Sequence, residues 1–445
     1  MKQIARGIIF TLLCAYFQVN ITAQVFFSQG GKINDFDTFE KVDSFPISVA
    51  GLSNYINDSF GLSKVCINLT HDRVSDLRIE LLAPDGTKLW LSNRNGGTEG
   101  RNYLATCFKN GGFSGYVREG SAPFIGDYIP DGRLEFVNNG QNPNGIWYLL
   151  IADLKPEYIG DINEILLHFE ENPNPNKDKS PCDFNNAKDC FSTAKNGDLL
   201  PDLVLVEEIT RNNITVFDAN HAEYPAQIRF AAAIANIGEG PIETFGKNEW
   251  YCGNERVKDG EVICKDGSNP RQTLYQRVYQ KKPNSDTLSY VDVAAGTNYF
   301  DEKPGHSHYH VDDWVSFRIL DGKYKKGKFK TKKIIASGSK VSYCLFDSGI
   351  CNNQDSLCLI SGISYGRANL KNYGLGNYKA CNADIQGISV GGYDTYGYLY
   401  EGQFLQLPKN LKTGTYFLEV NIDPKNIYRE VNEKNNVYLF QFSIK

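Results

Sequence analysis

Residues 77–91, LRIELLAPDGTKLWL, decide the fold class, because they contain two short apolar runs on either side of a turn. Residues 77–82 and 87–91 are rich in Leu, Ile and Trp, and Pro84-Asp85-Gly86 between them is a strong turn signal. The pattern predicts two β-strands joined by a turn.

Strand-like runs bounded by turn residues recur along the chain. In the first part they cover residues 65–70, 133–137, 145–152 and 162–170. In the last part they cover residues 203–209, 227–237, 311–320, 340–346, 415–422 and 437–444. Helical periodicity is scarce, so we expect an all-β chain. The first part should form a sandwich or jelly roll, and the last part a second β-sandwich with long, disulfide-tied loops.

Length and composition narrow the class of protein. A chain of 445 residues is long enough for two or three domains. With 41% hydrophobic and 22% charged residues it is globular, and the 13% aromatic content favours strands. The net charge of -5 provides no global positive field, so we expect no nucleic-acid partner.

The N-terminus has the pattern of a secretory signal. Lys2 and Arg6 precede an apolar run at residues 8–17, and Ala23 offers a small-residue cleavage site. The run is too short for a membrane span, and no other run of about 20 apolar residues occurs. We expect residues 1–23 to be a signal peptide and the protein to be secreted. A retained membrane anchor is the alternative.

Cysteine usage agrees with export. Once Cys14 leaves with the signal, ten cysteines remain, and an even number in a secreted chain favours disulfides. No CxxC pair occurs, so a structural zinc site is not expected. Sequence alone leaves the connectivity open, but the plausible local pairs are Cys66–Cys107, Cys182–Cys190 and Cys252–Cys264.

A linker divides the chain. Residues 171–181, ENPNPNKDKSP, combine prolines with charge, and prolines hold a chain extended and outside a sheet. We therefore place the linker at residues 172–185, with one domain at residues 24–171 and another at residues 186–445.

The first domain resembles a known module. Residues 75–91, SDLRIELLAPDGTKLWL, and residues 145–153, GIWYLLIAD, resemble the P domain found beside subtilisin-type proprotein convertases. That resemblance implies an eight-stranded jelly roll. No protease serine motif accompanies it, so it implies a folding, docking or binding module whose partner is unknown. Some domains of this family bind calcium, but the sequence assigns no ligands.

Three histidines lie within five residues, in GHSHYH at residues 305–310. Three imidazoles form a protein ligand set for Cu(II) or Zn(II), and spacing does not choose between the two ions. On an ideal strand His306 and His310 would lie about 13 Å apart, so one ion can bind all three only if the backbone bends. Pro304-Gly305 makes a bend possible. The alternative is three exposed polar residues on a hairpin.

The second domain resembles the lysyl oxidase family. The resemblance is carried by HSHYHVDDWVSFRIL at residues 306–320, SKVSYCLFD at 339–347, GYDTYG at 392–397 and IDPKNIYREVNEKNNV at 422–437. It extends over residues 186–445. It implies that His306, His308 and His310 bind copper, and that Lys340 and Tyr396 are the precursors of lysine tyrosylquinone.

The resemblance implies a secreted, copper- and quinone-dependent amine oxidase. It would use O2 to convert primary amines, peptidyl lysine among them, to aldehydes with release of H2O2 and ammonia. Asp394, two residues before Tyr396, is the candidate base, and a turn or capping role is its alternative. Another interpretation is a non-catalytic extracellular binding or adhesion protein with a vestigial or structural metal site.

The chain also departs from that family. Gly305 and Gly392 stand near positions where animal lysyl oxidases have cysteines, and Phe317 replaces a histidine that follows the ligands. The resemblance nevertheless implies a retained Cys344–Cys381 bridge, with Cys351–Cys358 as a local loop. The lysine-rich stretch at residues 323–333 is either a solvated hairpin or a surface that steers acidic substrates.

Overall fold

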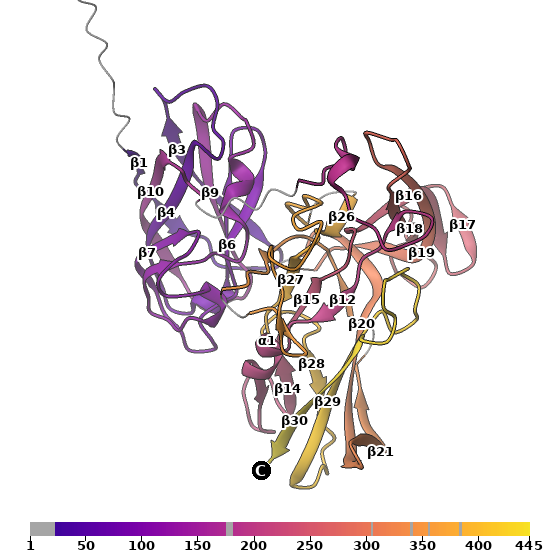
Figure 1. Ribbon diagram of the computed structural model, residues 1–445. Helices are drawn as coiled ribbons and strands as arrows, with labels where there is room; N and C mark the ends of the chain where they lie inside the picture. Colours follow the sequence, from indigo (N-terminus) through magenta and orange to yellow (C-terminus); the bar gives the residue numbers. More distant parts are fainter. Residues whose placement is uncertain (1–22, 175–180, 304–305, 339–340, 355–356, 382–384) are drawn as a thin grey trace, which may run out of the picture.

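The computed structural model describes residues 23–174, 181–303, 306–338, 341–354, 357–381 and 385–445. Strands dominate these residues (Figure 1), and the one α-helix among them is α1 (Glu207–Asn212). The all-β prediction is therefore confirmed. Strands β1 to β10 form two sheets that share no strand with the sheets formed by β11 to β30. We call these two units the first and the second sandwich.

The first sandwich packs two sheets face to face. One sheet has the order β1 (Gln24–Ser28), β10 (Gly160–Glu171), β4 (Phe60–His71), β7 (Tyr103–Lys109) and β8 (Phe124–Tyr128), with β2 (Gly31–Ile33) also on β10. The other has the order β3 (Lys41–Val49), β9 (Gly145–Asp153), β5 (Leu77–Leu82) and β6 (Lys88–Asn93).

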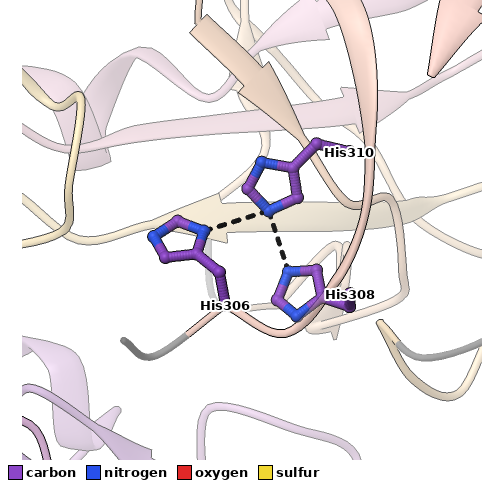
Figure 2. Close-up of side chains that lie close together, drawn as sticks. All are labelled: His306, His308 and His310. Atoms are coloured by element: carbon purple, nitrogen blue, oxygen red, sulfur yellow. Dashed lines mark hydrogen bonds between the residues drawn. The ribbon is translucent and has the colours of Figure 1, made fainter. Parts of the chain in front are cut away.

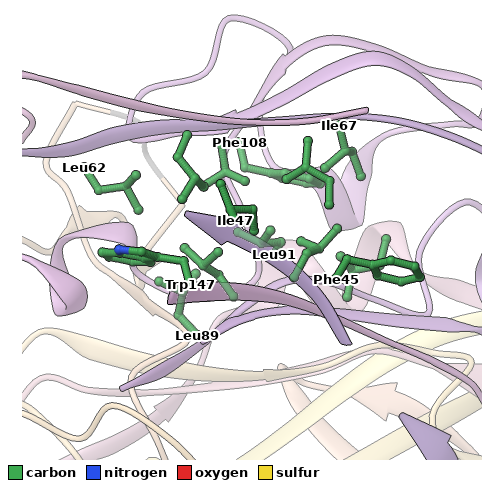
Figure 3. Close-up of a cluster of buried hydrophobic side chains, with 14 of the residues drawn as sticks. Phe45, Ile47, Leu62, Ile67, Leu89, Leu91, Phe108 and Trp147 are labelled. Carbon is green, nitrogen blue, oxygen red and sulfur yellow. The ribbon is translucent and has the colours of Figure 1, made fainter. Parts of the chain in front are cut away.

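Alternation along the strands builds the first core. In β3, Phe45, Ile47 and Val49 are buried, while the residues between them face solvent. Side chains from the two sheets meet between them, with Trp147 of β9 fully buried (Figure 3). This interior is the hydrophobic core that a jelly roll requires.

The stretch at residues 77–91 forms the predicted strand–turn–strand unit. β5 and β6 pair antiparallel with Leu81 opposite Leu89. At the turn between them, the Asp85 carboxylate accepts a hydrogen bond of 2.9 Å from the Thr87 amide. Gly86 has a φ of +89, which a residue with a Cβ adopts only under strain.

Two predicted strands contain a helical turn instead, and of the predicted strand at residues 340–346 the described part forms only β22 (Val341–Tyr343). Residues 133–137 contain a 3-10 helix (Leu134–Val137), in which Leu134 and Val137 share one turn and pack into the core. The run at residues 203–209 begins as β12 (Leu203–Leu205) but continues as α1, whose first turn carries two acidic residues that suit a helix N-terminus.

The second sandwich is built on an 11-stranded sheet. Its main order is β17 (Glu255–Val257), β16 (Ile242–Cys252), β18 (Arg271–Gln280), β19 (Ser289–Asp301), β20 (His308–Lys325), β29 (Gly414–Ile422) and β30 (Val437–Ile444). Four further strands pair with it: β11 (Asp198–Leu199), β21 (Lys328–Ser337), β22 (Val341–Tyr343) and β26 (Ile385–Ile388).

Smaller sheets complete the second sandwich. One has the order β12, β15 (Ala232–Asn236), β27 (Gly392–Tyr396) and β23 (Gly349–Ile350). Another joins β13 (Ile214–Val216), β14 (Gln227–Phe230) and β28 (Phe404–Gln406), and β24 (Leu359–Ile360) pairs with β25 (Ile363–Ser364). Their apolar residues, such as Phe230, share one core with Trp314 and Phe317 of β20.

All five expected disulfides are present: Cys66–Cys107, Cys182–Cys190, Cys252–Cys264, Cys344–Cys381 and Cys351–Cys358. The lysine-rich stretch at residues 323–333 lies on the β20–β21 hairpin with its lysines exposed, which confirms the solvated hairpin. Across the described ranges, no helix has the length and apolar character needed to cross a bilayer.

The two sandwiches are in contact through charged and aromatic side chains. Glu223 of the second accepts hydrogen bonds from Arg73 and Lys155 of the first, the latter at 2.8 Å. Trp90 of β6 packs edge-on against Phe346 of the second sandwich, with ring centroids 4.9 Å apart. These contacts place β6 beside the second sandwich.

Candidate metal centre

The three histidines are brought together where β19 turns into β20. Asp301 at the end of β19 lies opposite His308, and Tyr299 lies opposite His310. Ser307 has a φ of +55, in the left-handed region, so the backbone departs from strand geometry between His306 and His308. The predicted bend is therefore present, although Pro304-Gly305 lies outside the described residues.

Figure 2 shows the three imidazole rings turned toward one another. Nε2 of His310 lies 2.9 Å from Nε2 of His308 and 3.1 Å from Nδ1 of His306. Two nitrogens bound to one ion at about 2 Å, and not opposite each other, lie about 3 Å apart. The three side chains therefore fit a single copper or zinc ion.

The protonation state of the trio suits metal binding. Burial lowers the pKa of His306 to about 2, of His308 to about 3 and of His310 to about 2, and the neighbouring histidines add to the effect. At neutral pH the imidazoles are uncharged, which is the form that ligates a metal ion.

Asp301 was not predicted from the sequence. Its Oδ2 atom lies 3.5 Å from Nδ1 of His310 and 3.5 Å from Nδ1 of His306. Because the Nε2 atom of His310 faces the other two rings, a carboxylate on its Nδ1 side is placed to orient the ring. Only the β19–β20 pairing brings Asp301 here, and no motif in the sequence marks it.

Tyr396 lies in the same cavity as the histidines. It ends β27, and its ring stacks on Tyr343 with centroids 3.6 Å apart, while its hydroxyl donates to the Cys344 carbonyl oxygen. Tyr396, Tyr343 and the three histidines line one cavity of ≈ 30 Å³. The sequence-predicted copper ligands and the predicted quinone tyrosine are thus neighbours in the fold.

Lys340 lies outside the described residues. The strand that follows it in sequence, β22, pairs with β20 just beyond the histidines, with Tyr343 opposite Val311. Ser342 of that strand also lines the cavity, and its hydroxyl hydrogen-bonds the Tyr299 hydroxyl at 2.7 Å.

Asp394 lies on the same face of β27 as Tyr396, two residues earlier. It is 1% exposed, and among the described residues neither carboxyl oxygen has a hydrogen-bond partner of ordinary geometry. Burial raises the pKa of Asp394 well above its usual range. Burial, followed by the negative charge of Asp394, also raises the pKa of Tyr396.

Phe317 takes no part in the site. The resemblance places a histidine near this position, but Phe317 is buried in the core of the second sandwich, with its ring 4.5 Å from that of Phe230.

The first sandwich contributes to the cavity, which sequence reasoning missed. Trp90, Asn93 and Arg94 line it together with the histidines. The Tyr400 hydroxyl, which lies beside Tyr396, donates a 3.1 Å hydrogen bond to the Asn93 carbonyl oxygen. No local signal marks these three residues, because their role depends on the docking of two separate units.

Comparisons with known proteins agree with this architecture. Residues 63–169 match the family model for the proprotein convertase P-domain, and residues 277–444 match the model for lysyl oxidase. Over 133 residues, or 30% of this chain, it is 31% identical to protein-lysine 6-oxidase from Homo sapiens, covering 25% of that protein.

Two other relatives match over the same share of this chain. Lysyl oxidase homolog 1 from Homo sapiens is 34% identical, with 18% of its length covered. Protein-lysine 6-oxidase from Sus scrofa is 30% identical, with 42% covered. The match thus spans less than half the length of each of these relatives.

Proposed function

Because the chain carries a P-domain followed by a lysyl oxidase domain, we propose that it is a copper-dependent amine oxidase. It converts primary amines, peptidyl lysine among them, to aldehydes with O2 and releases H2O2 and ammonia. The observation that carries the proposal is the convergence of three imidazole nitrogens, 2.9 and 3.1 Å apart, in the cavity that Tyr396 lines.

His306, His308 and His310 would hold the copper ion. Their uncharged rings offer the nitrogen donors that Cu(II) prefers, and His310 is fully buried while the other two are partly buried. Asp301 lies on the Nδ1 side of His310, away from the Nε2 atom that faces the other rings. Zinc would bind to the same donors, and metal analysis of the purified protein distinguishes the two ions.

Tyr396 and Lys340 would supply the quinone cofactor. Lysine tyrosylquinone provides an electron sink for amine oxidation that no ordinary side chain offers. The protein's own part is positioning. Tyr343 fixes the plane of the Tyr396 ring, and the Cys344 carbonyl oxygen fixes the direction of its hydroxyl.

Asp394 is the proposed base. It shares a face of β27 with Tyr396, and burial gives its carboxylate a high affinity for a proton. A carboxylate of this kind takes a proton from a neighbouring carbon more readily than an exposed aspartate does, provided that it is ionised when substrate is bound.

The remaining assignments extend this proposal. Residues 1–23 would be a signal peptide and the enzyme extracellular, with the P-like domain at residues 24–171, the linker at 172–185 and the catalytic domain at 186–445. Calcium in the P-like domain stays a prediction. Within the described ranges, every cluster of three metal-ligating side chains lies in the second sandwich.

The test is copper loading followed by aerobic maturation of the full chain. We expect stoichiometric copper, a visible quinone absorbance, a Lys340–Tyr396 crosslink by peptide mass spectrometry and H2O2 from alkyl amines. Lys340→Arg should abolish the crosslink and keep copper, whereas Lys333→Arg on the exposed hairpin should change neither.

Two results would favour other functions. A protein without stoichiometric copper would support the binding or adhesion alternative. A protein that binds zinc but forms no crosslink would support a structural metal site.

A further inference from the structure

We propose that Trp90 and Arg94 of the first sandwich determine the substrate specificity of the metal site, by limiting entry to unbranched primary amines. The inference rests on the proposed amine oxidase function and adds a substrate class to it.

Trp90 is held by contacts to both sandwiches. Its ring packs on Phe346 and joins the apolar cluster of the Cys344–Cys381 disulfide. Its indole Nε1 donates a 3.1 Å hydrogen bond to Glu80. The carbonyl oxygen of Cys344 in turn accepts a hydrogen bond from the Tyr396 hydroxyl. Trp90 is therefore part of the packing that surrounds Tyr396.

Trp90 also separates two spaces. The inner space is the ≈ 30 Å³ cavity of the histidines and Tyr396. Next to it is an outer cavity of ≈ 290 Å³ between the sandwiches, and Trp90, His306, His308 and Cys381 line both. Glu40 and Lys88 of the first sandwich lie on the outer wall. The indole thus forms part of the boundary between the two cavities, together with His306, His308 and Cys381.

Arg94 lines the inner cavity directly after β6. Its backbone has a φ of +55, and its amide donates a 2.9 Å hydrogen bond to the Leu77 carbonyl oxygen, so the segment that follows β6 is held in a defined turn. Its positive charge lies near the histidines and is partly balanced by Glu401, which lines the same cavity, so Arg94 acts here mainly by occupying space at the wall.

The part of the first sandwich that lines the inner cavity is held in place by contacts away from the cavity. Arg73 and Lys155 bind Glu223, and Arg118 donates a 2.8 Å hydrogen bond to the Tyr393 hydroxyl. With the sandwiches docked in this way, the inner cavity has room for about one or two water-sized groups. The terminal CH2–NH2 of a straight chain fits this space, and a ring or branch on the carbon that bears the nitrogen does not.

The decisive measurement is kcat/KM for H2O2 formation from n-butylamine and from benzylamine, using the copper-loaded full chain. Trp90→Ala should raise the benzylamine to n-butylamine ratio about tenfold or more. Arg94→Ala, which leaves the Trp90 packing in place, should raise it less. Trp90→Phe should keep the wild-type ratio, and Lys155→Ala is the control for looser docking.

A second readout needs neither copper nor turnover. Diethyl pyrocarbonate acylates accessible neutral imidazoles, and mass spectrometry can follow the peptide that contains His306, His308 and His310 relative to His221. In the metal-free protein we expect slow acylation of the trio, and several-fold faster acylation in Trp90→Ala.

The outcomes separate this inference from the proposed function. An unchanged amine ratio in a folded Trp90→Ala protein would overturn the specificity role, whatever the acylation rate. An increase in Lys155→Ala as large as in Trp90→Ala would also overturn it, because docking rather than the indole would then set access. If the wild-type protein binds no copper and oxidises neither amine, the proposed function fails. The acylation rates then decide alone whether Trp90 closes the histidine pocket.

Discussion

The ring of Tyr343 lies flat against the ring of Tyr396, with centroids 3.6 Å apart and planes 10° from parallel. Tyr343 is itself immobilised, because Gln403 donates to its hydroxyl and β22 pairs with β20. The plane of Tyr396 is thus determined by a residue on the strand that follows Lys340 in sequence.

This stack predicts different results for two substitutions at position 343. Tyr343→Phe keeps the stacked ring, so the Lys340–Tyr396 crosslink should form at close to the wild-type yield. Tyr343→Ala frees the Tyr396 ring to rotate, so the crosslink yield should fall several-fold while copper stays bound. Peptide mass spectrometry after copper loading measures the yield. Equal yields from both variants would show that the stack has no positioning role.

Asp301→Asn should weaken copper binding about 10–100-fold, because it removes the carboxylate that orients His310. The three ligands remain, so binding should be weakened and not lost. Titration against a competing chelator measures the change. Asp286→Asn, at an exposed ion pair with Lys188, is the control and should bind copper as the wild type does. Wild-type affinity in Asp301→Asn would rule out the orienting role.

Sequence reasoning succeeded where the pattern is local. Apolar runs bounded by turn residues located β9 and β30, and the spacing of His306, His308 and His310 predicted both a shared candidate site and the bend that it requires. It failed where the partner is distant. Asp301 reaches the histidines through strand pairing, and Trp90 through the docking of two sandwiches. Residues 134–137 were misassigned because a short apolar run looks alike in a strand and a 3-10 helix.

Ser307 offers a direct test of the bend. At the φ of +55 found at position 307, glycine is free of strain, whereas backbone strain destabilises a β-branched residue by about 1–2 kcal/mol. Ser307→Gly should therefore bind copper as the wild type does. Ser307→Val should bind it about tenfold or more weakly, because the unfavourable left-handed turn would reduce the free energy of binding. Equal affinities in the same chelator titration would mean that the left-handed turn does not control the site.

Asp76 predicts a specific pH dependence of stability. Burial raises its pKa to about 6, although Arg73 hydrogen-bonds it, so the folded chain holds this proton more tightly than the unfolded chain does. The contribution of this proton to the free energy of unfolding is fully present below about pH 3.8. It is lost as the pH rises through about 6, which lowers the free energy of unfolding by about 3 kcal/mol.

Asp76→Asn removes this titration. The free energy of unfolding of the wild type should therefore fall relative to that of the variant between about pH 4 and pH 7. Urea unfolding at several pH values measures the difference, and a difference that does not change with pH would contradict the assignment. Asp153 and Lys155 also face Asp76, and both are kept in the variant.

The docking at Glu223 and Trp90 has a consequence for any shortened form of the chain. Without the first sandwich, Phe346 and the Cys344–Cys381 bridge would lose their aromatic cover, and Glu223 would lose both of its cations. The histidine cavity would then be open on the side that the first sandwich covers, and an exposed, aggregation-prone apolar surface would lie beside it. If the excised second sandwich precipitates, or oxidises amines without selectivity, the cause would be loss of the cover that the first sandwich provides.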